Sequence, residues 1–159
     1  MADWNNVYGF NMRVIKEIAL AEPLVDCVEP RAVLTNSVPI LTLDILTCTK
    51  DDLQFASDFV LTVKKSDFCH AFVAYFECAF TQVHKPIVFS TGPQAKYTHW
   101  KQTVFYLKDT LTVCGEEEIR GRISCRPNPR NPRDLDIEIQ YNFEGRHMRH
   151  SATQQYHLM

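Results

Sequence analysis

The chain has 159 residues, of which 45% are hydrophobic and 23% charged, and its formal net charge is −2 at pH 7. These values predict one globular domain with a sizeable core, and the charge gives no reason to expect direct binding to nucleic acid or to a membrane surface. No apolar run approaches the roughly 20 residues of a membrane-spanning helix, and no secretory signal opens the sequence.

The N-terminal region predicts a short amphipathic helix over residues 12–21. Asn11 is a candidate cap for its start, and Pro23 predicts its end because a residue before proline avoids the helical conformation. A helix this short is marginal alone in water, so we expect it to dock on a partner surface. Its apolar face is formed by Val14, Ile15, Ile18 and Leu20.

From residue 33 onward the pattern is typical of β-structure. Short apolar segments are separated by turn residues at regular spacing, which predicts a mainly β domain, a barrel or sandwich of about eight to ten strands. The expected strands are 38–46, 59–64, 68–81, 100–107, 111–113, 119–126, 135–143 and 148–156.

Two of these segments predict where the core lies. Residues 135–143 alternate strictly between apolar and polar, so one face should be buried and the other solvated. Residues 68–81 carry four phenylalanines on one face and mostly small or apolar residues on the other. We therefore expect that segment to be covered on both sides and central in its sheet.

The cysteines and the charged clusters offer no complete site. None of the six cysteines forms a C-x-x-C pair, so we expect reduced thiols in a cytosolic or nuclear protein and no metal site. The glycines form no G-x-G pattern, and no P-loop or G-x-S-x-G motif is present. We expect the acidic run 116–118 to lie at the rim of a hairpin. We expect the arginines within residues 120–133 to lie on a solvent-exposed strand edge and loop.

Several motifs in fixed order carry a resemblance to a known family. The motifs are NNVYGFNM (5–12), EPLVD (22–26), HAFVAYF (70–76), FSTGP (89–93), YTHWKQTVFYL (97–107) and NPRDLD (131–136). With these motifs the sequence closely resembles the protein arginine N-methyltransferases, and within them the type I enzymes.

The resemblance runs from about residue 4 to the C-terminus and covers only the C-terminal half of such an enzyme. It implies a helical dimerisation arm in residues 1–30 and a β-barrel in residues 31–159. The family's Rossmann-like domain, which binds S-adenosylmethionine and carries a pair of catalytic glutamates, has no counterpart here. We therefore expect a C-terminal fragment that binds no cofactor and is inactive alone.

The resemblance also implies site residues. His99 and Trp100 match the family's THW loop, in which the histidine pairs with a carboxylate of the other domain or relays a proton and the tryptophan walls the arginine pocket. Tyr97 and Thr98 are weaker candidates for substrate binding. The arm residues that match are Tyr8, Phe10, Met12 and Ile15.

For the complete enzyme the resemblance implies homodimers through the arm and substrates that are Arg/Gly-rich proteins, including histone tails, in the cytoplasm and nucleus. An alternative of another class stays open. The chain could act as a non-catalytic β-barrel module that binds Arg-rich tails or a full-length enzyme, and the amphipathic arm motivates this alternative.

Overall fold

A computed structural model describes residues 4–159, so the first three residues of the predicted 1–30 arm lie outside the described part. The described chain is mainly β, which confirms the predicted fold class. Two short 3-10 helices, Pro30–Ala32 and Asp51–Leu53, lie in connections. The remaining elements are α1 (Arg13–Ala21), β1 (Leu24–Asp26), β2 (Phe55–Thr62), β3 (Asp67–Ala74), β4 (Glu77–Phe80), β5 (Ile87–Ser90), β6 (Gln102–Val113), β7 (Glu118–Pro127), β8 (Leu135–Glu144) and β9 (Arg149–Leu158).

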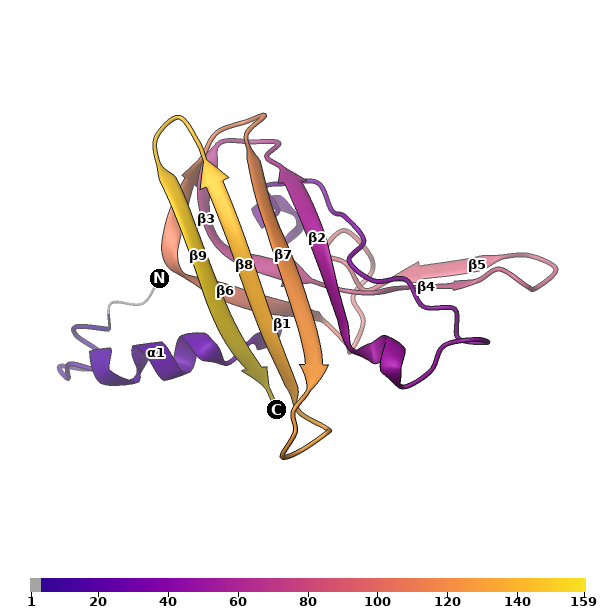
Figure 1. The fold of residues 1–159 in the computed structure, drawn as a ribbon. Coiled ribbons are helices and arrows are strands. Elements are labelled where there is room, and N and C mark those ends of the chain that lie inside the picture. Colours follow the sequence, from indigo (N-terminus) through magenta and orange to yellow (C-terminus); the bar gives the residue numbers. More distant parts are fainter. Residues whose placement is uncertain (1–3) are drawn as a thin grey trace.

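The strands form two sheets that face each other and a separate two-stranded ribbon (Figure 1). One sheet has the order β2-β7-β8-β9, the other has the order β1-β6-β3, and β4 pairs with β5 in the ribbon that projects from the body. All these pairings are antiparallel. Within residues 4–159 no strand ladder closes the two sheets into a barrel, so the arrangement is a sandwich.

The core lies between the two sheets, as the alternating segment predicted. Along β8, Ile137, Ile139, Tyr141 and Phe143 are buried while the residues between them are exposed, which confirms the expected period of two. From the facing sheet, Leu107 and Leu111 of β6 have no exposed surface.

β6 is one long strand where the sequence predicted two. The predicted break at residues 108–110 coincides with an irregularity in the pairing of β3 with β6. Cys69 pairs with Leu111 but Ala71 pairs with Tyr106, so β6 carries extra residues between these two pairs. Such a bulge bends a strand without ending it.

The predicted strand 38–46 is wrong, because no strand is assigned to these residues. The Asp44 side chain accepts a hydrogen bond from the Leu46 backbone N–H at 3.0 Å, and the Asp44 carbonyl accepts one from Cys48 at 2.8 Å. These bonds form a local turn that competes with strand pairing. Ile45 and Leu46 are left 80% and 84% exposed.

The predicted central strand 68–81 is also wrong. The segment divides into β3 and β4, which belong to different sheets, and β3 is an edge strand. The division follows from Thr91, whose backbone N–H donates to the Phe76 carbonyl at 2.9 Å and whose hydroxyl accepts from the Phe76 N–H at 3.1 Å. Phe68 and Phe80 are 58% and 52% exposed rather than covered.

The predicted helix is confirmed as α1, which lies beside β6 and β9 (Figure 1). Met12 occupies the N-cap position, and the Asn11 side chain accepts a hydrogen bond from the Arg13 N–H at 3.2 Å. Glu22, the residue before Pro23, is extended and ends the helix. No residue of α1 is buried.

Gly121, in the middle of β7, is required by close packing. A Cβ atom at this position would lie 2.4 Å from the Phe59 ring and 2.5 Å from the Gln140 carbonyl oxygen.

We expect Gly121→Ala to lower the free energy of unfolding by about 1–3 kcal/mol, measured by urea denaturation, because the backbone oxygen of Gln140 cannot move aside for the added Cβ. The matched control is Gly115→Ala, whose Cβ would meet no atom closer than 4.0 Å. Equal stability of the two variants would contradict this account.

Tyr141 predicts a loss of stability at alkaline pH. Burial raises the pKa of its phenol from 10.0 to about 12. Above pH 10 the unfolded chain releases this proton while the folded chain retains it, so the stabilisation is complete below pH 10 and declines as the pH rises towards 12. We expect Tyr141→Phe to make the free energy of unfolding fall less steeply in this window. An unchanged slope would show that Tyr141 does not titrate differently in the two states.

Candidate functional site

The candidate site is the His-Trp loop, defined as residues 97–101, which connects the β4–β5 ribbon to β6. His99 is exposed, and Tyr97 and Trp100 are 69% and 49% exposed. The Lys101 backbone N–H donates to the Thr98 carbonyl at 3.2 Å, which closes a tight turn around the histidine and tryptophan. The turn presents both rings at the surface.

The Trp100 ring is held by other aromatic rings. The His99 imidazole lies with its centroid 4.0 Å from that of Trp100. Phe89 of β5 stacks on Trp100 at 6.1 Å, and Phe76 contacts it edge-to-face at 5.5 Å. The aromatic cluster (Phe76, Phe89, His99 and Trp100) thus fixes the indole at the base of the ribbon, and a partly exposed indole face suits a cationic ligand.

Lys101 adopts a left-handed backbone conformation, with φ of 55°. This conformation is uncommon for a residue with a side chain and costs on the order of 1 kcal/mol. The Lys101 ammonium lies 3.2 Å from the Asp26 carboxylate. The Cys27 N–H and then Lys101 lower the pKa of Asp26, and Asp26 in turn raises the pKa of Lys101.

Gln102, the first residue of β6, anchors the loop from below. Its side-chain amide is buried, and its NH₂ group donates to the Thr91 carbonyl at 2.6 Å. Its side-chain oxygen accepts the Val28 backbone N–H at 2.8 Å. Sequence reasoning did not identify Gln102 or Thr91 as part of the site, although both lie within motifs that carried the resemblance. The signal in the sequence that could have identified Gln102 is a polar residue at the start of an apolar strand.

One packing contact and one enclosed hydroxyl group complete the surroundings of the loop. Tyr75 packs on Gly92, where a Cβ atom would lie 2.7 Å from the tyrosine ring, so the backbone after β5 passes close to the side chain of the residue that follows β3. The Thr98 hydroxyl is enclosed and has no hydrogen-bond partner within residues 4–159. The Thr98 hydroxyl is therefore shielded from solvent within the loop, whereas Tyr97 is exposed.

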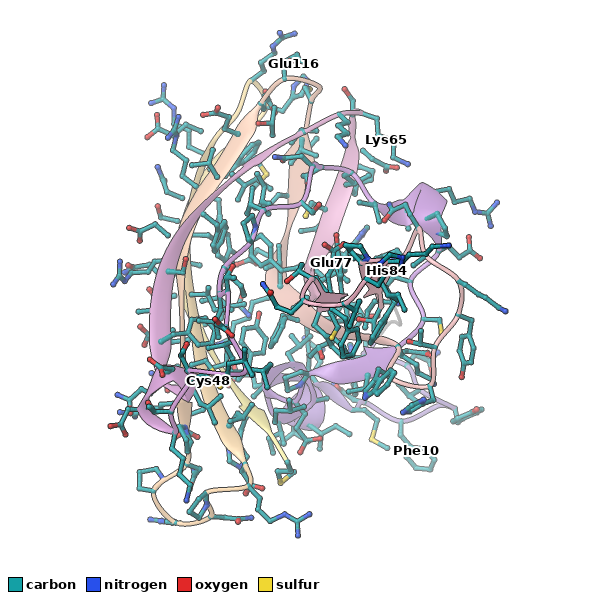
Figure 2. The ribbon with its side chains drawn as sticks, turned by 90° about the vertical axis from the view of Figure 1, so that its right-hand side faces the viewer. Phe10, Cys48, Lys65, Glu77, His84 and Glu116 are labelled. Atoms are coloured by element: carbon teal, nitrogen blue, oxygen red, sulfur yellow. The ribbon has the colours of Figure 1, made fainter. Side chains whose placement is uncertain are left out.

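The predicted arm residues lie in the N-terminal segment and mostly face solvent. Tyr8 and Gly9 have positive φ values of 51° and 88° and form a tight turn. Tyr8 is 97% exposed, Phe10 69% and Ile15 43%, while Met12 is partly buried. Figure 2 shows Phe10 at the margin of the domain, directed away from its body.

The acidic run 116–118 lies where the connection after β6 enters β7. The predicted hairpin rim is wrong, because β6 and β7 belong to different sheets and this connection crosses from one sheet to the other. Figure 2 shows Glu116 at the top of the domain, away from Glu77 and His84 of the ribbon region near the middle of the view. The Glu117 carboxylate accepts the backbone N–H groups of Cys114 and Arg146, each at 2.7 Å. Partial burial acts to raise the pKa of Glu117, but these two bonds outweigh it and lower the pKa.

Other charged side chains in the described part of the chain form ion pairs at its surface. Arg122 pairs with Asp58 at 2.8 Å on the exposed face of its sheet. Across residues 4–159, no group of three or more histidine, cysteine or acidic side chains is placed to hold a metal ion. All six cysteines are free thiols. No helix in the described part is long and apolar enough to cross a membrane.

Comparisons with known proteins show which family has this architecture. Residues 1–146 match the family model of the arginine methyltransferase oligomerization subdomain. The chain is 51% identical over 155 residues to protein arginine N-methyltransferase 1 of Dictyostelium discoideum, and 50% identical over the same length to that of Chlamydomonas reinhardtii. In each case 98% of this chain is covered, but only 46% and 45% of the relative. The chain therefore spans less than half the length of these relatives.

Solved structures agree. A chain of the Trypanosoma brucei PRMT1 enzyme-prozyme heterotetrameric complex with AdoHcy superposes with a TM-score of 0.93 at 36% identity, over 98% of this chain and 50% of that one. Arabidopsis thaliana protein arginine methyltransferase 10 superposes with a TM-score of 0.83 at 17% identity, over 97% of this chain and 49% of that one, which shows a shared fold. The chain belongs to the protein arginine methyltransferase family, through its oligomerization subdomain.

Proposed function

We propose that this chain is the C-terminal, substrate-side part of a type I protein arginine methyltransferase. The complete enzyme would transfer methyl groups from S-adenosylmethionine to arginines of Arg/Gly-rich proteins, including histone tails, in the cytoplasm and nucleus. Residues 1–30 would act as the dimerisation arm and residues 31–159, a sandwich rather than the barrel that the resemblance implies, as the substrate-side domain. The observation that carries the proposal is the His99–Trp100 pair, held rigidly at the surface of a chain of this family.

The chemistry of arginine methylation explains why such a loop is useful. A guanidinium has a pKa above about 12, so it must be oriented and must lose a proton as its nitrogen attacks a methyl group. His99, paired with a carboxylate outside this chain, would orient that carboxylate or accept the proton. Trp100 would provide an aromatic wall for the cation. Tyr97 would contribute its exposed side chain to the edge of the substrate site, and Thr98 would support the loop from its enclosed side.

S-adenosylmethionine supplies the methyl group when it is bound. We assign none of the residues of this chain to it, because the sequence has no glycine-rich cofactor motif. The Trypanosoma brucei complex contains AdoHcy, and the chain of it that resembles the present chain is covered to 50%. We accordingly place the cofactor in another part of the complete enzyme and propose that this chain is inactive alone.

A second function is favoured by the exposed arm. Tyr8, Phe10, Val14 and Ile18 are 97%, 69%, 81% and 65% exposed, which is a large apolar surface for a short segment. The chain would then be an interaction module that binds a full-length enzyme or an Arg-rich tail without catalysis. Association without any methyl transfer, even in mixed assemblies, would favour this second function.

Methyl transfer from labelled S-adenosylmethionine to an Arg-Gly-rich peptide tests the main proposal. We expect no transfer by the 159-residue chain alone and transfer by a full-length relative used as the positive control. The reason is that the chain presents an aromatic and imidazole surface without a cofactor site. Transfer by the chain alone would overturn the proposed division between its β-sandwich and the cofactor domain.

His99→Ala should reduce turnover when it is introduced into a longer protein that contains this chain and a cofactor domain. We expect kcat to fall at least about tenfold, because a positioned acid–base group contributes about 10²–10⁴-fold. His84→Ala is the matched control, since His84 lies in the exposed connection between β4 and β5. Equal activities of the two variants would remove His99 from the site.

Self-association through the arm should depend on its exposed rings. We expect the molar mass of the chain from light scattering to rise with concentration, and Phe10→Ser to reduce that rise because it removes an apolar anchor. Ile87→Ser, at a position on the ribbon that is 60% exposed, serves as the control. A mass that is independent of concentration, or equal effects of the two substitutions, would contradict a dimerising arm.

A further inference from the structure

Three separate segments of the chain meet at the side chain of Gln102. The amide nitrogen bonds to the Thr91 carbonyl at the end of the ribbon, and the amide oxygen bonds to the Val28 N–H that follows β1. Gln102 itself begins β6 and pairs with Asp26 in the β1–β6 ladder. One buried amide therefore ties the His-Trp loop to both neighbouring segments.

Lys101 provides a second connection to the same place. Its ammonium contacts the Asp26 carboxylate at 3.2 Å, and its backbone is left-handed. A residue with a side chain retains this conformation only where the surroundings enforce it. The enforcing groups are the Thr98 carbonyl, which closes the turn, and the buried amide of Gln102 on the following residue.

These contacts attach the C-terminal end of the loop to β1 and the residues after it, which follow the arm helix. The arm helix α1 ends at Ala21, and the chain continues through β1 to Asp26 and Val28, the two residues that contact Lys101 and Gln102. A displacement of β1 would therefore strain the base of the loop. The aromatic contacts of Trp100 hold the other side of the loop against the ribbon.

We propose that Gln102 and Lys101 are positioning residues that couple the segment after the dimerisation arm to the orientation of His99 and Trp100. Neither side chain needs to touch the substrate for this role. The benefit to catalysis rests on the proposed function, but the coupling itself is a property of the present chain. The experiment that tests the coupling therefore measures the conformation of the loop itself.

The experiment is NMR and hydrogen exchange on the 159-residue chain. In the native loop the His99 ring protons lie close to the Trp100 ring, so their signals should be displaced by the indole ring current. Gln102→Met preserves the volume of the side chain but removes both hydrogen bonds. We expect the His99 signals to move towards free-histidine positions, and amide exchange in residues 97–101 to accelerate at least about tenfold.

Two further variants separate the contacts. Gln102→Glu retains the acceptor for the Val28 N–H but loses the donor to Thr91, so the loop should stay tied to the arm side and loosen on the ribbon side. Lys101→Gly removes the ion pair while tolerating the left-handed backbone, and it should accelerate loop exchange by about two- to fivefold. Because that pair is exposed, this variant also provides the test if Gln102→Met does not fold.

Arg122→Met is the control for nonspecific effects, because it breaks an exposed ion pair with Asp58 on the other sheet. It should leave the His99 signals and the loop exchange unchanged. If Gln102→Met and Lys101→Gly also leave both unchanged while the chain stays folded, the coupling is wrong. If both respond but a longer enzyme carrying these changes keeps its full kcat, the coupling is present and the catalytic role assigned to the loop is wrong.

Discussion

The contact on which the fold depends is the packing of Phe72 between the two sheets. Its ring lies edge-to-face with Phe59 at 5.6 Å and with Tyr141 at 5.4 Å, so residues of β3, β2 and β8 share one aromatic contact. No continuous strand ladder joins the two sheets in the described chain, and side-chain burial must keep them face to face. Gly121 admits the Phe59 ring at the centre of the sheet, and the bend in β6 keeps its apolar residues in the core.

The sequence predicted best those strands whose pattern records one buried face. Residues 135–143 alternate without interruption, and β8 occupies that range with one added residue. Residues 38–46 have the composition of a strand, but Asp44 forms a local turn with the backbone. The segment 68–81 failed for another reason. Its division depends on Thr91, which is 15 residues beyond Phe76, and a local pattern does not contain such a partner.

In the candidate site, too, the sequence did not reveal contacts between residues that are distant along the chain. The resemblance located His99 and Trp100, but it did not show how they are held. Gln102 contacts Val28, which is 74 residues away, and Thr91, which is 11 residues away, and neither separation follows a strand or helix period. The left-handed conformation of Lys101 is likewise invisible in a sequence, because lysine gives no signal of positive φ comparable to that of glycine.

The electrostatics of the loop bear on the division of labour in the complete enzyme. The loop contacts the Asp26 carboxylate, and that charge is already paired with Lys101. A guanidinium beside Trp100 would gain an aromatic surface but would meet a lysine nearby, which opposes binding of a second cation. Under the proposed function, orientation of the arginine would therefore require negative charge from outside the loop. An exposed imidazole at His99 is suited to meet a carboxylate, so the proposal assigns the loop to one wall of the arginine cleft and the charged wall to the cofactor domain.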